Sequence, residues 1–324
     1  CRDWFQLSLK EGFTVFRDAE FSSDMNSRSV KRIEDVGFLR SIQFAEDAGP
    51  LAHPVRPSSY MEISNFYTTT IYEKGAEVVR MYHTLLGEDA FRQGTDLYFD
   101  RHDGTAATTD DFADAMAQAG QIDLAQFKRW YEQPGTPKVQ VAESYADGML
   151  TLNITQAPAD LPNAQQQQPF HMPLAMGFLA PDGASLTLSD ADIDSAATTS
   201  LRDDGQTLLL GAKESTTELT ISNLHAKPVV SFLRGFSAPV KVSHQRDAEE
   251  LAFLVQHDTD GFVRWDAMQT LWMSHLDASA VTTVDPVAVL GGLAKGALEL
   301  ATPEQQLLAA IMLTVPNENY LFEQ

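Results

Sequence analysis

Apolar residues along the first 136 positions recur at intervals of three and four, the spacing that places side chains on one face of an α-helix. In the segment 27–44 the apolar positions of that face are Val30, Ile33, Val36, Leu39 and Ile42. The same pattern predicts helices over 7–16, 75–86, 88–99, 109–120 and 124–131. Gly87 is expected to stop one of them, and Thr109 to cap the helix that closes at Gly120. We expect this part of the chain to be mainly helical.

From Pro137 the pattern alternates with a period of two, which indicates short strands. The predicted strands cover 138–141, 149–154, 171–179, 185–188, 207–210, 218–221 and 229–233. Asp147 and Gly148 form the expected turn between the first two strands, and the polar run 163–168 is expected to be a loop. Several short strands at this spacing predict a small β-sandwich.

After His244 the spacing of three and four returns and predicts helices over 248–256, 262–276, 287–298 and 303–313. Successive helices of this kind stack into larger arrays. The fold class expected is therefore multidomain α+β, with modules at 1–136, 137–243 and 244–324. The chain opens within dense aromatic and charged sequence and stops within the helical array, so we expect an internal piece of a longer protein.

Composition narrows the possible partners. Hydrophobic residues make up 44% of the chain and charged residues 21%, as in folded proteins. The 45 acidic and 23 basic residues give a net charge of −22, which argues against nucleic-acid binding. No apolar run reaches the roughly 20 residues of a membrane span, so no membrane insertion is expected. The single cysteine, Cys1, excludes an intrachain disulfide and a cysteine-cluster zinc site, and it favours a reducing cytoplasm.

Two carboxylates and a tyrosine are candidates for chemistry. Glu11 and Asp18 are seven positions apart and share one face of a helix, where they could be a metal ligand and an acid that orients a neighbouring ligand. Such a pair is more often a solvated face. Tyr72, expected between a strand and a helix, could stabilise a developing oxyanion, although a tyrosine that packs its ring is commoner. Glu73 and Lys74 are typical of surface charges at a helix start.

The eight histidines include no His-x-x-x-His pair, so no His-Glu-x-x-His motif occurs. His83 fits a structural role on its helix, and His102 with Gly104 fits a helix stop. The sequence also contains no nucleophile elbow, phosphate loop or dinucleotide fingerprint.

Several blocks of the sequence are characteristic when taken together, namely 1–18, 65–67, 71–78, 97–104, 130–131, 135–137 and 236–240. In order and spacing they resemble the aminopeptidase N family of gluzincin zinc metallopeptidases, in its gram-negative bacterial form, across essentially the whole chain.

This resemblance implies a zinc-dependent enzyme that removes N-terminal residues from peptides with a free N-terminus. Glu11 matches the third protein ligand of one zinc ion (Zn²⁺), and Asp18 matches an acidic group behind the ligands. Tyr72 matches the tyrosine that stabilises the tetrahedral intermediate, and Tyr67 falls where the pocket for the first substrate side chain is lined. The first module would be the helical second half of a thermolysin-like domain.

The same resemblance places the histidine pair, the general base and the amine anchor upstream of Cys1, in the remainder of the parent chain. Catalytic zinc sites use three protein ligands, so this polypeptide alone is predicted to be inactive and essentially free of zinc. Two alternatives stay open. One is a non-enzymatic scaffold that has lost the metal site, and the other is an unrelated carbohydrate binder built on the sandwich.

Overall fold

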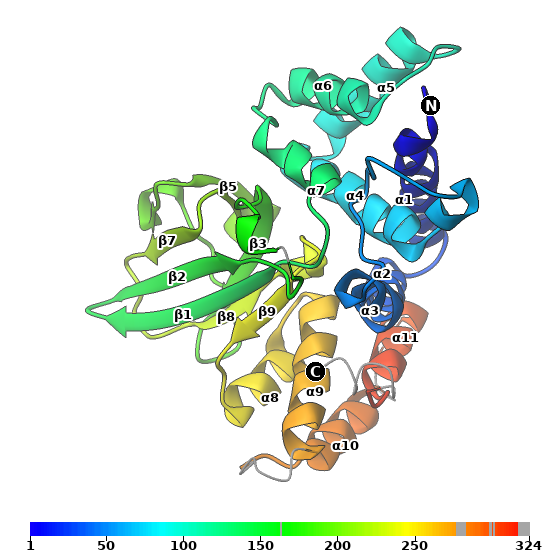
Figure 1. Ribbon diagram of the computed structural model, residues 1–324. Coiled ribbons are helices and arrows are strands. Elements are labelled where there is room, and N and C mark those ends of the chain that lie inside the picture. The colour runs from blue at the N-terminus through cyan, green and yellow to red at the C-terminus, as the bar shows by residue number, and fades with distance from the viewer. Residues whose placement is uncertain (163, 277–282, 298–299, 301, 317–324) are drawn as a thin grey trace.

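The chain folds into two helical modules joined by a β-sandwich (Figure 1). The computed structural model describes residues 1–162, 164–276, 283–297, 300 and 302–316. Asn163 of the predicted loop and Leu298 of the predicted third C-terminal helix lie outside these residues. Buried apolar residues of all three modules form one continuous core, so the modules pack against one another.

The first module consists of helices of the α, 3₁₀ and π type. They are η1 (Trp4–Gln6), α1 (Leu7–Met25), α2 (Arg28–Phe38), η2 (Leu39–Gln43), α3 (Phe44–Ala48), η3 (Ile63–Phe66), η4 (Thr70–Lys74), α4 (Gly75–Leu86), α5 (Glu88–His102), α6 (Thr109–Gly120), η5 (Gln126–Lys128) and α7 (Arg129–Glu132). Gly87 ends α4 at a φ of 78°, as a glycine after a helix can. The mainly helical prediction for this region is confirmed.

Two details of the helix predictions are wrong. The residue that caps α6 is Thr108 and not Thr109, because the Thr108 hydroxyl accepts from the backbone N–H of Asp111 at 3.2 Å. In the helix expected over 27–44, Ile42 is exposed and Gln43 is buried. The reason is that η2 is a π-helix, whose turn holds an extra residue and moves the buried face on by one position.

The β-sandwich has a five-stranded and a four-stranded sheet, in the orders β4-β7-β2-β1-β9 and β5-β6-β3-β8. The strands are β1 (Lys138–Ala146), β2 (Met149–Ala157), β3 (Met172–Leu179), β4 (Ile193–Asp194), β5 (Thr198–Arg202), β6 (Thr207–Ala212), β7 (Thr216–Ile221), β8 (Val229–Phe232) and β9 (Lys241–His244). Asp147 and Gly148 both have positive φ, which the tight turn between β1 and β2 requires.

The strand predicted over 185–188 is wrong, and β4, β5 and β9 were not predicted. Ser185 pairs with Leu179 in a single bridge. The backbone N–H of Leu188 donates to the carbonyl of Gly205 at 2.9 Å, in the segment before β6. The segment 185–188 therefore forms isolated backbone hydrogen bonds and not the continuous pairing of a strand. β9 pairs in parallel with β1 and forms one edge of its sheet.

The C-terminal module contains α8 (Ala248–His257), α9 (Gly261–Leu276), α10 (Pro286–Ala297) and α11 (Pro303–Met312). These four helices lie where the returning periodicity predicts them. None of the helices in the described residues combines the length and the apolar composition that a bilayer crossing requires.

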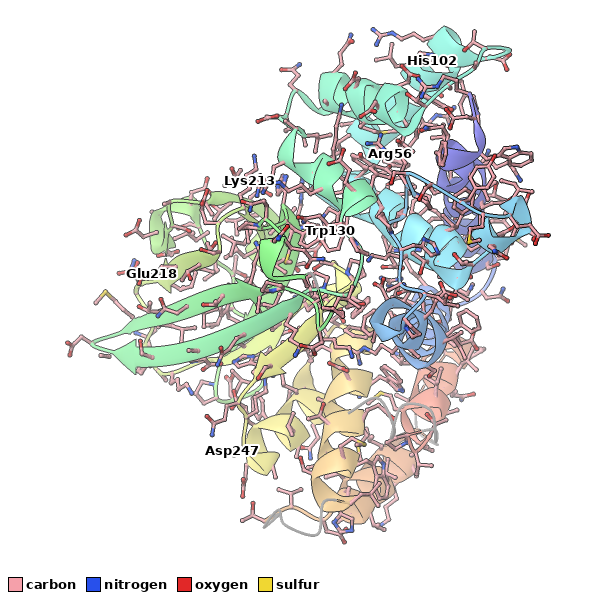
Figure 2. The ribbon with its side chains drawn as sticks, in the orientation of Figure 1. Arg56, His102, Trp130, Lys213, Glu218 and Asp247 are labelled. Atoms are coloured by element: carbon pink, nitrogen blue, oxygen red, sulfur yellow. The ribbon has the colours of Figure 1, made fainter. Side chains whose placement is uncertain are left out.

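Buried polar contacts fasten the sandwich to the first module. Arg32 of α2 donates to both carboxylate oxygens of Glu77 in α4, each at 2.6 Å. It also donates to the carbonyls of Gly235 and Phe236, in the short helix η9 (Arg234–Phe236). Trp130 of α7 donates its indole N–H to the carbonyl of His171 at 2.9 Å, beside the start of β3 (Figure 2). The first module and the sandwich are therefore joined by buried hydrogen bonds as well as by apolar packing.

Candidate active site

A close crossing of two helices positions Glu11 and Tyr72. A Cβ atom added to Gly12 of α1 would lie 2.6 Å from the carbonyl carbon of Gly75, the first residue of α4. A Cβ on Gly75 would lie 3.3 Å from the Cα of Gly12. The two backbones therefore touch with no side chain between them, which only glycine permits. Glu11 stands one residue before the first glycine, and Tyr72 three residues before the second.

The Tyr72 hydroxyl donates a hydrogen bond to the Glu11 carboxylate. Burial, together with the negative charge and the hydrogen bond of Glu11, raises the pKa of Tyr72 above its ordinary value. The neighbouring Lys10 forms an ion pair with Glu11, and this hydrogen bond raises the pKa of the lysine. A carboxylate, a protonated phenol and an ammonium group thus meet at this point.

Tyr67 lies beside the same group. Its ring centroid is 6.4 Å from that of Tyr72, and the Nζ atom of Lys10 lies 5.9 Å from the Tyr67 ring. Tyr67 is 48% exposed, so much of its ring faces solvent. The structure brings Glu11, Tyr72 and Tyr67 together, and it adds Lys10, which the sequence did not single out.

Asp18 does not join this group. It lies two turns further along α1 with an exposed side chain. Within the described part of the chain it makes no hydrogen bond or ion pair, whereas Glu11 contacts both Lys10 and Tyr72.

The segment that carries Tyr72 is a π-helix and not the end of a strand. In η4 the backbone N–H and the hydroxyl of Thr70 donate to the Glu46 carboxylate, at 2.7 and 2.6 Å. Gln43 of η2 also donates to the Thr70 hydroxyl, at 3.2 Å. π-Helical turns are frequent at functional sites because they redirect a side chain. The two π-helical segments are therefore joined at Thr70, two residues before Tyr72.

Lys74 closes η4 and is buried, so the prediction of a surface charge is wrong for this residue. Its Nζ atom donates to Asp47 at 2.8 Å and to the carbonyl of Gly135 at 2.9 Å. Asp47 also accepts from the Thr136 hydroxyl at 2.9 Å. Burial disfavours the Asp47 carboxylate, but the charge and hydrogen bond of Lys74 outweigh it and hold the pKa of Asp47 below its usual value. No pattern in the sequence distinguishes this lysine from an exposed one.

The residues present fit one zinc ligand and not a complete zinc site. Across the described residues no three His, Cys, Asp or Glu side chains are grouped so that they could hold a metal ion. Glu11 offers a carboxylate, which can be one ligand of zinc, but catalytic zinc takes three protein ligands. Ligands from outside the described residues would have to complete the site.

Family comparisons cover the three modules separately. Residues 1–131 match the family described as Peptidase family M1 domain. Residues 135–245 match a domain of unknown function with an Ig-like fold, and residues 248–324 match one described as ARM repeats. The predicted order of catalytic-type helices, β-sandwich and helical array is confirmed.

Individual relatives extend along most of the chain. Aminopeptidase N of Escherichia coli is 43% identical and is matched over 100% of this chain and 37% of its own length. Aminopeptidase N of Caulobacter vibrioides is 48% identical over 84% of this chain and 30% of its own length. The crystal structure of Legionella pneumophila aminopeptidase A in complex with aspartic acid has a TM-score of 0.77 at 25% identity, covering 97% of this chain and 33% of that one.

The chain thus spans about a third of the length of these relatives. The resemblance drawn from the sequence blocks is confirmed. Residues 1–131 match the peptidase family M1 domain, and over its whole length the chain is similar to the bacterial aminopeptidases N.

Proposed function

We propose that this chain is part of a zinc-dependent aminopeptidase that removes N-terminal residues from peptides. The module proposed at 1–136 contributes the site, and those at 137–243 and 244–324 form the sandwich and the start of the helical array. The observation that carries the proposal is the contact between Glu11 and Tyr72 at the crossing of Gly12 and Gly75. The remainder of the parent chain and a peptide with a free N-terminus are the proposed partners.

In this proposal Glu11 is one of the ligands of a zinc ion in the complete protein. A bound zinc ion supplies polarisation of the scissile carbonyl and a water of lowered pKa. In this structure the Glu11 carboxylate accepts from Tyr72 and pairs with Lys10. Both donors would give way to the zinc ion where it binds the same oxygens, which would leave the Tyr72 hydroxyl free to turn to the substrate.

Tyr72 is the proposed donor to the oxyanion that develops on the substrate. A tyrosine hydroxyl has an ordinary pKa of about 10, so it is protonated at neutral pH, as a donor must be. Tyr67 is the proposed wall for the first side chain of the substrate, because its exposed ring flanks Tyr72. Asp18 stays a prediction from the resemblance, since its side chain is exposed. A cytoplasmic location likewise stays a prediction from the sequence.

The test is the Tyr72→Phe variant of the complete protein that contains this chain. Loss of one oxyanion donor is expected to lower kcat for an alanyl chromogenic amide by about 10²- to 10³-fold with little change in KM. Tyr60→Phe is the matched control, because Tyr60 is an exposed tyrosine that packs against Phe5 and Phe66. Equal activity of the two variants would remove Tyr72 from the reaction.

A polypeptide of these 324 residues is expected to hydrolyse no substrate and to bind zinc more weakly than micromolar. Isothermal titration with zinc and the same amide assay measure both properties. Turnover by this polypeptide would show that the site needs no further ligands.

The competing proposal is a scaffold that has lost its metal site, and the lack of a histidine pair in the sequence favours it. It requires natural translation to begin near Cys1. An upstream reading frame that encodes His-Glu-x-x-His excludes the scaffold.

A further inference from the structure

The short helix α3 holds both ends of the π-helical segment that carries Tyr72. Its Glu46 carboxylate accepts from the backbone N–H and the hydroxyl of Thr70, the first residue of η4, at 2.7 and 2.6 Å. The next residue, Asp47, accepts from the Nζ atom of Lys74, the last residue of η4, at 2.8 Å. Tyr72 is the middle residue of the segment. Two consecutive carboxylates therefore fix the segment before and after the tyrosine.

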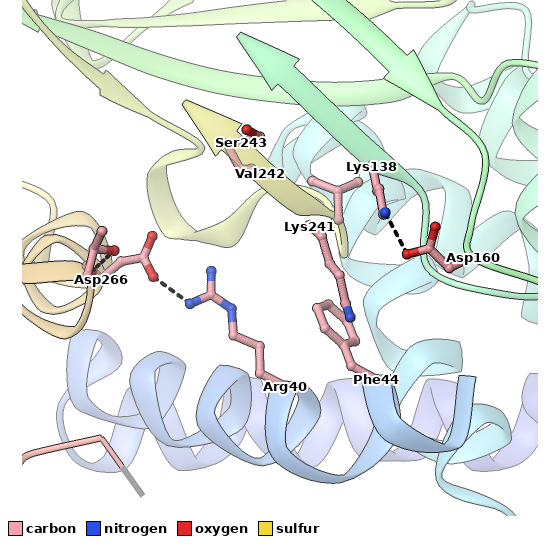
Figure 3. Close-up of a pocket in the computed structure, with 10 residues that line it drawn as sticks. Arg40, Phe44, Lys138, Asp160, Lys241, Val242, Ser243 and Asp266 are labelled. Carbon is pink, nitrogen blue, oxygen red and sulfur yellow. Dashed lines mark hydrogen bonds and ion pairs between the residues drawn. The ribbon is translucent and has the colours of Figure 1, made fainter. Parts of the chain in front are cut away.

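The helix α3 is itself fixed against the sandwich. Its first residue, Phe44, is 4% exposed, and its ring centroid lies 6.5 Å from that of Phe236. The Nζ atom of Lys241 in β9 lies 5.8 Å from the Phe44 ring, in the wall of a cavity between the sandwich and the helices (Figure 3). The segment η4 is therefore connected through α3 to the sandwich as well as to its own helical module.

The hydrogen bonds at Thr70 have a fixed direction. Because an ionised carboxylate only accepts, the Thr70 hydroxyl donates to Glu46, and its oxygen accepts from the side-chain amide of Gln43 at 3.2 Å. The Gln43 Oε1 atom is then left buried and, among the described residues, without a hydrogen-bond partner. A buried acceptor without a partner costs free energy, so stability alone does not explain this network. Buried polar networks also specify one geometry of the segments that they join.

Glu46 caps the first turn of η4 from a different element. The residue before η4, Thr69, makes no side-chain capping hydrogen bond. The N–H groups of Ile71 and Tyr72 donate to the hydroxyl and the carbonyl of Thr68, at 3.3 and 3.2 Å. Thr68 belongs to the same stretch of chain and moves together with η4, whereas Glu46 belongs to α3. A carboxylate at this place also interacts favourably with the free N–H groups at the start of a helix.

This support becomes important when Tyr72 changes its partner. In the structure the Tyr72 hydroxyl donates to Glu11. In the proposed reaction the hydroxyl turns from Glu11 to the substrate, and from then on the backbone position of Tyr72 decides where it points. An oxyanion donor has to lie about 2.7–3.1 Å from the developing charge. A displacement of about 1 Å is enough to lower a rate about 10²-fold.

We propose that Glu46 is a positioning residue for Tyr72, which holds the first turn of η4 so that the tyrosine hydroxyl reaches the developing oxyanion. In this role Glu46 touches neither the substrate nor the zinc ion and acts only through Thr70. The inference rests on the proposed aminopeptidase function, and it adds a residue that the sequence did not single out.

The test is a double-mutant cycle in the complete protein that contains this chain, with kcat and KM measured for an alanyl chromogenic amide. Glu46→Ala should lower kcat by about 10- to 100-fold with little change in KM, because it misplaces a donor that acts in the transition state. In a Tyr72→Phe background the same substitution should lower kcat by less than about twofold, because the hydroxyl that it positions is gone. A purely structural role would lower kcat by the same factor in both backgrounds.

Further variants provide a rescue, a milder change and a control. Glu46→Gln should keep kcat within about threefold, because both hydrogen bonds of Thr70 reach one oxygen, Oε1, which glutamine also supplies. Thr70→Val removes only the hydroxyl contact and should lower kcat about three- to tenfold when Tyr72 is present, so it replaces Glu46→Ala if that variant does not fold. Glu34→Ala, which changes an exposed carboxylate of α2, should leave kcat and KM unchanged. Circular dichroism shows which variants are folded.

Three outcomes would overturn the inference. Full kcat in Glu46→Ala, together with a loss in Tyr72→Phe, means that Tyr72 is positioned without Glu46, and it leaves the proposed function intact. An equal loss of kcat in both backgrounds makes Glu46 a structural residue. Full kcat in Tyr72→Phe removes the proposed role of Tyr72 itself, and the positioning role of Glu46 with it.

Discussion

Two charged clusters of the first module each take one residue from the same short segment, and they differ completely in environment. Lys10, Glu11 and Tyr72 meet near the surface, where the Lys10 side chain is 55% exposed. Lys74 and Asp47 form an ion pair in which the two side chains are 1% and 0% exposed. Tyr72 and Lys74 belong to the same π-helical segment, η4.

The difference shows how one short segment serves two purposes. Residues two apart on a helix point to opposite sides, so η4 directs Tyr72 toward Glu11 and Lys74 into the interior. The buried pair also binds Gly135 and Thr136 ahead of β1, and it therefore anchors η4 against the sandwich. In the outer cluster Glu11 can leave Lys10 or Tyr72 for another partner, because water can solvate the group that is left. In the inner pair a separation of Lys74 from Asp47 would leave a buried charge without its partner.

The largest effect is expected from Lys74→Met. It leaves the Asp47 carboxylate buried without its cation, which should lower the free energy of unfolding by about 3–5 kcal/mol. Urea denaturation measures the loss. Lys74→Met combined with Asp47→Asn removes both charges and should recover part of it. A loss of less than about 1 kcal/mol in the single variant would mean that the inner pair is not an anchor.

The second-largest effect is the pH dependence of stability that comes from another buried titratable group, His171. It falls in a different pH range from the effect of the inner pair. Burial lowers the pKa of His171 to about 4, from an ordinary value near 6.5. The unfolded chain therefore takes up the proton first, and stability should fall by about 3 kcal/mol as the pH drops from about 6.5 to about 4.

Asp47 acts in a lower pH range. Its folded pKa lies below the ordinary value of 3.8, so the stability it contributes is present above that value and is lost as the pH falls below it. Denaturation of the His171→Phe variant at several pH values should show a shallower loss between about 6.5 and 4, with the steep loss at lower pH retained. Burial also lowers the pKa values of His83 and His244, so part of the slope in this window should remain. An unchanged slope in that window would assign the acid sensitivity to another group.

A smaller effect is expected at the helix crossing that supports the outer cluster. The Cβ of Gly12→Ala would clash with the Gly75 backbone, which should cost about 1–3 kcal/mol of unfolding free energy and separate Glu11 from Tyr72. Gly37→Ala is the matched control, because no atom lies within 4 Å of the added Cβ. Alanine there should be neutral or stabilising by up to about 1 kcal/mol. Similar losses in the two variants would contradict a tight crossing.

The smallest effect on stability is expected from Glu11→Gln. Its partner Lys10 is exposed, and exposed ion pairs contribute about 0–1 kcal/mol. Thermal unfolding should therefore change little, in contrast to Lys74→Met. A loss as large as that of the inner pair would make Glu11 a structural residue and would weaken its proposed role as a ligand.

Most of the architecture follows from sequence periodicity. The helices of both helical modules and the longer strands have strong patterns, and their positions were predicted. Some ends were not, because α1 continues to Met25 beyond the predicted end at 16 and β1 continues to Ala146 beyond the predicted end at 141. The short strands β4 and β5 were not predicted, because segments of two and five residues are too short to show a clear alternation of apolar and polar positions. The sequence did not predict that Gln43 is buried in place of Ile42. The periodicity argument assumes a regular α-helix, whereas η2 is a π-helix.

The candidate site was predictable in its members but not in its geometry. Glu11, Tyr72 and Tyr67 came from a family resemblance, since their spacing alone is compatible with solvated or packed side chains. The contact between Glu11 and Tyr72 depends on two glycines 63 positions apart, Gly12 and Gly75. A single sequence does not reveal which glycines will meet.

The sequence by itself determined the order of the three modules, the type of most elements and the family resemblance. Local periodicity and the spacing of sequence blocks can be recognised without knowing which residues meet in the folded protein. Only the tertiary structure decided which charges are buried, as for Lys74, and which distant residues meet, as for Lys138 and Lys241. The physical reason is that burial and contact depend on how helices and strands pack. Identical lysines are therefore exposed or buried according to neighbours that are remote in sequence.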